Sequence, residues 1–241
     1  GWTGPYMITE WGPNGHWESP QTAWKVSIEQ SSTEKYAVYY DRYKKYIEPN
    51  TNYCLGSYAF LWGAKQEYTE TWYGLYTKDN KPTEPVDAIQ KVFTNKPIEN
   101  PAPTIVDFTV NKKTAKQNVE LKAEEKNFAV FNAKISEKGS SKKPKYTWRI
   151  MRESTDKKAG GDVEKAASEI GGLIKKNGGP NKVVFRAPKI PGLYRLFVSV
   201  EHNGKVAYSN IPFKVNPRDK NEKQARPVQF KYTDMSSFEN N

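Results

Sequence analysis

The sequence predicts a parallel α/β fold in residues 1–97 and an antiparallel β-sandwich in residues 104–216. Three observations favour this division. Residues 1–76 hold six of the seven tryptophans and eleven of the fifteen tyrosines. The linker at 98–103 falls in "PIENPAPT", whose three prolines are typical of a stiff, extended connection. Strand and helix patterns alternate before this linker, whereas short strands separated by turns follow it.

Two apolar strands are predicted in the first part. "YMITE" (residues 6–10) shows no polar alternation before its glutamate, and "YCLGSYAFLWG" (residues 53–63) is too apolar to have a solvent-facing side. Both therefore read as strands buried on both faces. Two strands cannot complete such a sheet. We expect residues 1–97 to be the C-terminal fragment of a larger parallel β/α fold, with earlier strands upstream of Gly1.

A helix is predicted after each strand. The tyrosines between residues 31 and 50 recur at helical spacing, with Ser32 or Thr33 as N-cap and Pro49 at the end. Residues 84–96, "EPVDAIQKVFTNK", begin with proline near the first helical position and repeat apolar residues at helical intervals. The order strand, helix, strand, helix predicts parallel strands with helical crossovers, a fold class that keeps its active site at the carboxyl ends of the strands.

The second part reads as about seven short strands, several with period-two alternation. Asn203 and Gly204 form the centre of a hairpin turn. "VEKAASEIGGLIKK" (163–176) is interpreted as a helical insertion between strands. The polar residues 217–241 are expected to form a loose tail.

The composition argues against several classes of function. The net charge of +11 belongs to the second part, because residues 1–100 carry 10 Lys and Arg against 12 Asp and Glu. These lysines are interpreted as solvated rather than nucleic-acid-binding, since no recognition motif accompanies them. No membrane span is predicted. The single cysteine, Cys54, and two histidines, His16 and His202, predict no disulfide, metal site or cofactor.

Two motifs resemble a known enzyme class. "ITEWGPNGHWE", followed by "GSYAFLWG" and "TWYGL", resembles the last two β/α units of a clan A (β/α)₈-barrel retaining glycoside hydrolase, with families 2 and 5 as the nearest members. This resemblance implies that Glu10 is the catalytic nucleophile and that Trp62 lines the sugar site. The clan's acid/base glutamate has no counterpart in this sequence. "PGLYRLFVSVEHNGKVAYSNIPFKV" resembles the immunoglobulin-like or PKD-like modules found behind bacterial glycosidase barrels.

Sugar chemistry points to further candidates near these motifs. The apolar C–H faces of sugar rings pack on aromatic side chains, while the hydroxyls need polar partners nearby. The candidate substrate-binding residues are therefore Trp62, Trp11, His16, Trp17, Glu67 and Trp72. Loop packing for the tryptophans and a salt bridge for a glutamate remain the alternative readings.

The expected function is that of the C-terminal portion of a secreted, periplasmic or cell-surface glycoside hydrolase acting on β-linked polysaccharide. Retaining hydrolysis needs two carboxyl groups about 5–5.5 Å apart, so the fragment alone is predicted to be inactive. The predicted partner is carbohydrate, and self-association through the incomplete barrel is expected. The alternatives are a non-catalytic carbohydrate-binding protein and a structural spacer or docking module.

Overall fold

The computed structural model describes residues 2–136, 142–158, 162–175 and 179–218, so most of the predicted tail lies outside the described residues. The helices are α1 (Ser32–Arg42) and α2 (Glu84–Thr94), with single turns η1 (Tyr43–Ile47), η2 (Glu48–Asn50) and η3 (Ala115–Gln117). The strands are β1 (Tyr6–Trp11), β2 (Cys54–Ala59), β3 (Thr104–Val110), β4 (Val119–Lys122), β5 (Lys126–Lys134), β6 (Lys145–Arg152), β7 (Ile174–Lys175), β8 (Lys182–Arg186), β9 (Gly192–His202) and β10 (Lys205–Asn216).

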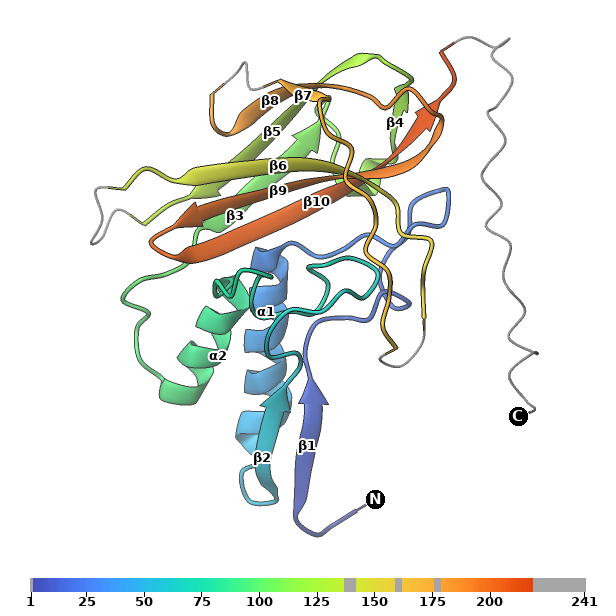
Figure 1. Ribbon diagram of the computed structural model, residues 1–241. Helices are drawn as coiled ribbons and strands as arrows, with labels where there is room; N and C mark the ends of the chain where they lie inside the picture. Colours follow the sequence, from blue (N-terminus) through green and yellow to red (C-terminus); the bar gives the residue numbers. More distant parts are fainter. Residues whose placement is uncertain (1, 137–141, 159–161, 176–178, 219–241) are drawn as a thin grey trace, which may run out of the picture.

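Residues 2–97, here called the α/β unit, contain the two predicted strands and two predicted helices. β1 and β2 pair in parallel, and α1 packs beside α2. In Figure 1 the arrowheads of both strands point toward the sheets formed by the second half of the chain. The carboxyl ends of β1 and β2 therefore face the remainder of the molecule.

The N-cap of α1 is Ser31, so the prediction of Ser32 or Thr33 was wrong. The Ser31 side chain accepts a hydrogen bond from the Glu34 amide, and the Glu34 carboxylate accepts one from the Ser31 amide. This reciprocal capping box satisfies two amides at the start of the helix. The hydroxyls of Ser32 and Thr33 instead hydrogen bond to Glu84 at the start of α2.

The prediction that both strands are buried on both faces was wrong. The helices cover one face only, where Ile8 and Cys54 pack against the cluster around Tyr39. On the opposite face Met7, Leu55 and Tyr58 are exposed, with 71% of Leu55 accessible to solvent. Among the described residues no further strand pairs with β1 or β2. Within the described residues, this apolar face therefore lacks a covering layer.

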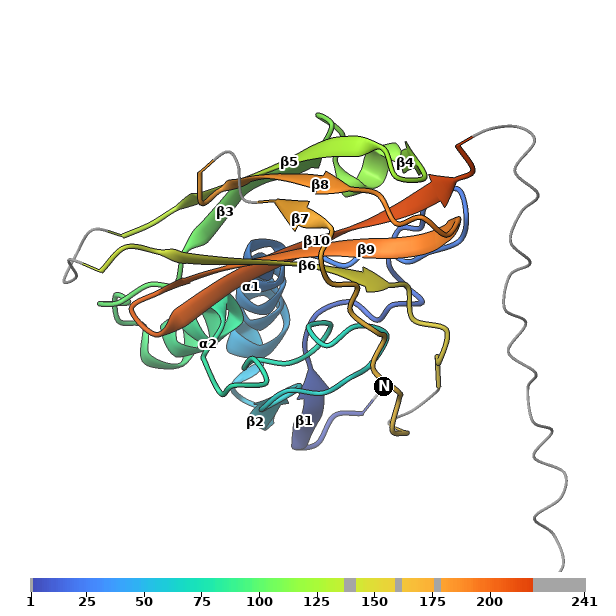
Figure 2. The same cartoon turned by 45° about the horizontal axis from the view of Figure 1, so that its top comes forward.

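The remaining strands form two four-stranded sheets, here called the two-sheet unit (residues 104–218). Their orders are β4-β10-β9-β6 and β3-β5-β8-β7, and Figure 2 shows them as two layers above α1. The core between them contains side chains with no solvent exposure, namely Phe131, Ile150, Leu196, Val200 and Phe213. All pairings are antiparallel except that of β4 with β10, which is parallel.

The predicted helix at 163–176 is absent from residues 162–175, which the structure describes. This segment belongs to an excursion between β6 and β7, whose described residues 153–158 and 162–173 run down beside the α/β unit in Figure 1. Glu169 bridges to Met151, and Ile174 pairs with Phe185 of β8. Sheet pairing and a positive φ of 77° at Gly172 override the helical propensity of the alanine-rich stretch.

The outer face of β9 and β10 packs directly onto the α/β unit through polar side chains. Two ion pairs are buried at this junction: Lys35 with Glu29 at 2.6 Å, and Arg195 with Glu153 at 2.8 Å. Burial alone would raise the pKa of Glu29, but the nearby Lys35 ammonium brings it below its ordinary value. Each pair lies within one unit, and hydrogen bonds join the two: Lys35 donates to the Tyr208 hydroxyl at 3.2 Å, Arg195 to the Ser27 carbonyl at 3.0 Å and Asn210 to Glu29 at 2.6 Å.

Replacing Glu84 with glutamine should remove a pH dependence of stability. Burial raises the pKa of Glu84 from 4.5 to about 7, against hydrogen bonds from Thr33 and Thr104. The Glu84 carboxyl therefore ionises at lower pH in the unfolded chain than in the folded one. The contribution of Glu84 to stability should be greatest below pH 4.5, fall by on the order of 3 kcal/mol as pH rises through 7, and then level off.

Urea denaturation of Glu84→Gln between pH 4 and 8 measures this effect. The variant should show a flatter profile and exceed the wild type in stability at pH 8. Glu99→Gln changes an exposed carboxylate and serves as the control. Parallel profiles for wild type and Glu84→Gln would show that Glu84 does not titrate in this range.

Candidate functional site

The carboxyl end of β1 is distorted by a bulge at the predicted nucleophile. Thr9 and Glu10 of β1 together oppose the single residue Tyr58 of β2. The extra residue shifts the alternation of side chains along the strand, so that Trp11 turns onto the helical side while Glu10 is exposed. Within the described residues the Glu10 carboxylate has no hydrogen bond or ion pair, so it is free to contact a ligand.

The two strand ends lie in close contact just beyond the bulge. A Cβ atom at Gly12 would lie 2.5 Å from the carbonyl oxygen of Phe60, so no larger residue fits there without a shift of the backbone. The Phe60 amide donates to the carbonyl of Trp11 at 2.8 Å. Arg42 of α1 binds the Gly12 carbonyl. These contacts fix the backbone on both sides of the candidate site.

Trp11 and Trp62 differ sharply in their exposure to solvent. Trp11 is 9% exposed and packs edge-on against Tyr39 of α1, with ring centroids 5.4 Å apart. Trp62, three residues beyond β2, is 72% exposed and rests on Tyr76 at 4.9 Å. Trp62 therefore presents an open indole face, whereas the indole of Trp11 is part of the packing between β1 and α1.

His16, Trp17 and Trp72 come together in one aromatic cluster, joined by Tyr68. The His16 ring stacks on Tyr68 at 5.0 Å and meets Trp17 edge-on at 4.9 Å. Trp72 lies beneath, 1% exposed, and donates its indole N–H to the Asn14 carbonyl at 3.0 Å. Only Trp17 is widely exposed, at 68%. The cluster thus offers one accessible indole on a buried aromatic base.

Glu67 lies beside this cluster but is already engaged. Its carboxylate, 9% exposed, binds the Lys65 ammonium at 2.6 Å. Burial lowers the pKa of His16, and the charges of Glu164 and Glu67 oppose this shift only in part. His16 is therefore neutral at pH 7 and has one ring N–H to donate and one ring nitrogen to accept.

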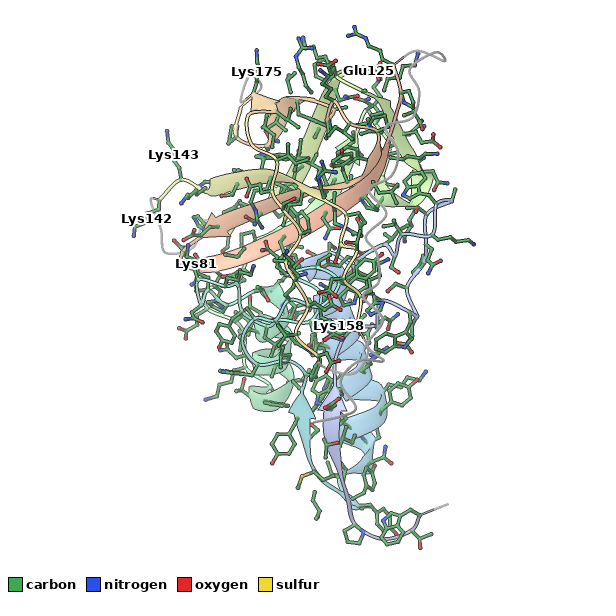
Figure 3. The ribbon with its side chains drawn as sticks, turned by 45° about the vertical axis from the view of Figure 1, so that its right-hand side comes forward. Lys81, Glu125, Lys142, Lys143, Lys158 and Lys175 are labelled. Carbon is green, nitrogen blue, oxygen red and sulfur yellow. The ribbon has the colours of Figure 1, made fainter. Side chains whose placement is uncertain are left out.

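The β6–β7 excursion contributes residues that the sequence pattern did not identify. Glu164, 5% exposed, accepts hydrogen bonds from the amides of Tyr68 at 2.6 Å and Lys158 at 3.1 Å. The Lys157 ammonium lies over the Tyr68 ring, 4.5 Å from its centroid. Figure 3 shows Lys158 beside the α/β unit, well below the sheets. Tyr68 is thus held between His16 and a segment some 90 residues away.

Two further properties bear on the class of site. Across residues 2–136, 142–158, 162–175 and 179–218, no group of three or more His, Cys, Asp or Glu side chains is arranged to bind a metal ion. In the same ranges, neither helix has the length and apolar character needed to cross a membrane.

Alanine substitutions should separate the structural tryptophan from the exposed one. Trp72→Ala removes a fully buried ring and its hydrogen bond to Asn14, and should cost about 3–5 kcal/mol of unfolding free energy. Trp62→Ala removes a ring that is mostly in water and should change stability by less than about 0.5 kcal/mol. Guanidinium denaturation checks both values. Equal losses in the two variants would contradict the placement of Trp62 at the surface.

Comparisons with known proteins found glycoside hydrolase structures at low similarity. An endo-beta-1,4-mannanase from Thermotoga petrophila aligns with a TM-score of 0.25 and 13% identity over 88% of this chain. A beta-glucuronidase from Bacteroides uniformis aligns with a TM-score of 0.23 and 10% identity, also over 88%.

Neither similarity is high enough to assign a shared fold or activity. The chain spans 39% of the mannanase and 22% of the beta-glucuronidase. No family model matches the sequence, and no curated protein does.

Proposed function

We propose that this chain is the C-terminal portion of a retaining glycoside hydrolase that acts on β-linked polysaccharide. In this proposal β1 and β2 are the last two strands of a (β/α)₈ barrel, and the two-sheet unit is an immunoglobulin-like module behind it. Glu10 is the nucleophile and Trp62 the platform for the sugar ring.

The observation that carries the proposal is the bulge at the end of β1. It leaves Glu10 exposed, and without a partner among the described residues, at the carboxyl end of a parallel strand, the edge where parallel β/α folds hold their reactive groups. The exposed indole of Trp62 follows the neighbouring strand. An ionised carboxylate beside an open aromatic face suits attack on the anomeric carbon of a sugar stacked on that face.

The second carboxyl group must come from strands that complete the sheet. The open apolar face formed by Met7, Leu55 and Tyr58 supports this arrangement, because such a face calls for a covering layer. In the complete protein a glutamate from that layer protonates the leaving oxygen while Glu10 forms a covalent glycosyl intermediate. Without it, this chain alone should show no turnover of aryl glycosides.

Covalent trapping in the full-length protein tests the proposal. A panel of 2-deoxy-2-fluoro β-glycosyl fluorides should inactivate the enzyme, and peptide mapping should place one sugar on Glu10. Labelling of another carboxylate would show that the nucleophile lies elsewhere. Sugar binding with neither turnover nor labelling would favour the alternative of a non-catalytic carbohydrate-binding protein, which the exposed indole of Trp17 also suits.

A further inference from the structure

A groove with a volume of about 260 Å³ lies where the two units meet, away from the end of β1. We call it the junction groove. One wall is the loop of residues 70–81 of the α/β unit, and the floor is the outer face of β6, β9 and β10. Figure 3 shows Lys81 in this region, at the boundary between the sheets and the helices.

The floor follows from the alternation of side chains along β9. Val198 and Val200 point into the core between the sheets, so Phe197, Ser199 and Glu201 face the groove. Thr147 of β6 lies directly opposite Ser199. Two hydroxyl groups therefore lie side by side on the floor, next to the ring of Phe197.

One end of the groove is closed by a charge cluster centred on Glu70. Its carboxylate binds Arg149 of β6 and, at 3.1 Å, the ammonium of Lys78. Burial raises the pKa of Glu70, but the hydrogen bond from Arg149 and the Lys78 charge bring it below its ordinary value. The guanidinium of Arg149 also lies over the Phe197 ring, 5.7 Å from its centroid. Glu70 and Arg149 are thus held in fixed positions.

The other end is organised in the same way around Lys81. Its ammonium binds Asp79 at 2.8 Å and Glu201 at 2.7 Å. Lys145 is the one cation lining the groove for which the described ranges of the chain contain no ion pair. The groove therefore presents fixed donors and acceptors with almost no excess charge.

We propose that the junction groove binds a neutral, linear oligosaccharide. Sugar hydroxyls both donate and accept, and the groove offers both kinds of group in fixed positions. It also offers the hydroxyls of Thr147 and Ser199, which have no hydrogen-bond partner in the described part of the chain. A polyanion would need unpaired cations along its length, and Lys145 alone does not supply them. An apolar ligand would displace the water that hydrogen bonds to the ion pairs and would supply no hydrogen bonds in its place.

The proposal goes beyond the catalytic role of Glu10 and does not depend on it. The groove requires both units, because its wall comes from the loop before α2 and its floor from β6, β9 and β10. A sugar chain bound there would be held by the junction itself. The site would hold polysaccharide on the protein, while the proposed hydrolysis takes place at the carboxyl ends of β1 and β2.

Titration of the ¹⁵N-labelled 241-residue chain with cellohexaose and with mannohexaose tests this site. At least one of the two should shift the backbone amide signals of Thr147, Ser199 and Glu201. Ser199→Trp fills the floor and should weaken that binding at least about tenfold, equivalent to 1.4 kcal/mol. Val106→Trp adds the same ring at an exposed position of β3 and should bind as the wild type does.

Two more variants keep the outcome clear. Thr147→Ala removes one hydroxyl without adding bulk and should also weaken binding. It therefore tests the site even if Ser199→Trp fails to fold. Trp62→Ala should leave the groove shifts unchanged, which separates this site from the proposed catalytic one. Shifts confined to Trp17 and Trp62 would overturn the groove assignment alone. The groove assignment would also be overturned if neither sugar shifted the groove signals, or if inorganic phosphate alone shifted them.

Discussion

Glu10→Gln in the full-length protein should lower kcat by at least about three orders of magnitude, equivalent to a barrier increase of about 4 kcal/mol. Glutamine keeps the size and hydrogen bonding of the side chain but removes the charge that attacks the anomeric carbon. Glu10 is exposed and has no ion pair among the described residues, so the substitution removes no interaction that supports the fold. Substrate binding and thermal stability should therefore stay close to those of the wild type.

Chemical rescue and a matched control sharpen this test. Glu10→Ala opens space for a small nucleophile, so azide should restore part of the turnover and yield a glycosyl azide of inverted configuration. Glu18→Gln exchanges another exposed carboxylate, on the loop that follows β1, which accepts a hydrogen bond from the Gly15 amide, and should keep nearly full activity. If Glu10→Gln retained more than about a tenth of the wild-type kcat, the nucleophile assignment would be wrong.

Local signals in the sequence were sufficient where short-range contacts decide the structure. The helix beginning at Glu84 follows from its proline and apolar spacing, and the structure places it at Glu84–Thr94. Asn203 and Gly204 both have positive φ, of 51° and 77°, as the predicted hairpin turn requires. Even the N-cap of α1 could have been found, because Ser31 stands three residues before Glu34.

Long-range pairing decides the features that sequence pattern misplaced. The stretch 163–176 has helical propensity, but the carboxylate of Glu164 binds the amide of Tyr68, 96 residues away, and neighbouring residues pair with β6 and β8. Trp11 was named as a candidate because aromatic rings pack on sugars. The bulge before it, which cannot be read from the sequence, turns it toward Tyr39 of α1. A one-residue shift in a strand moves the following side chains to the other face.

In the candidate site, too, short-range signals predict some features and long-range contacts decide the others. Placing Glu10 at a strand end required only the apolar run that precedes it. Bringing His16, Tyr68 and Trp72 together required the loops after both strands to meet, and no short-range signal predicts that contact. The sequence separated the two units at a proline-rich linker. Buried hydrogen bonds nevertheless join them, from Arg195 to the Ser27 carbonyl and from Asn210 to Glu29, and composition gives no sign of these contacts.

Arg195→Ala should be among the most destabilising single substitutions in the chain, costing about 3–5 kcal/mol. Arg195 is 1% exposed. Its guanidinium binds Glu153 through two nitrogens, at 2.8 and 3.1 Å, the Asn210 side chain at 2.6 Å and the Ser27 carbonyl at 3.0 Å. Removing it leaves the buried Glu153 carboxylate without its counter-ion, which is costly because water cannot replace the lost hydrogen bonds.

The same substitution should loosen both units together, since the network crosses the junction. Asn210 also donates to Glu29, which binds Lys35 of α1, so the loss of Arg195 reaches the α/β unit through two hydrogen-bonded partners. Arg186→Ala is the matched control, because that side chain is exposed on β8 and should change stability by less than about 0.5 kcal/mol. Urea denaturation gives the free energies, and amide hydrogen exchange shows where protection is lost. Faster exchange confined to β6, β9 and β10, with α1 unaffected, would show that the buried ion pairs stabilise the sheets without coupling them to the α/β unit.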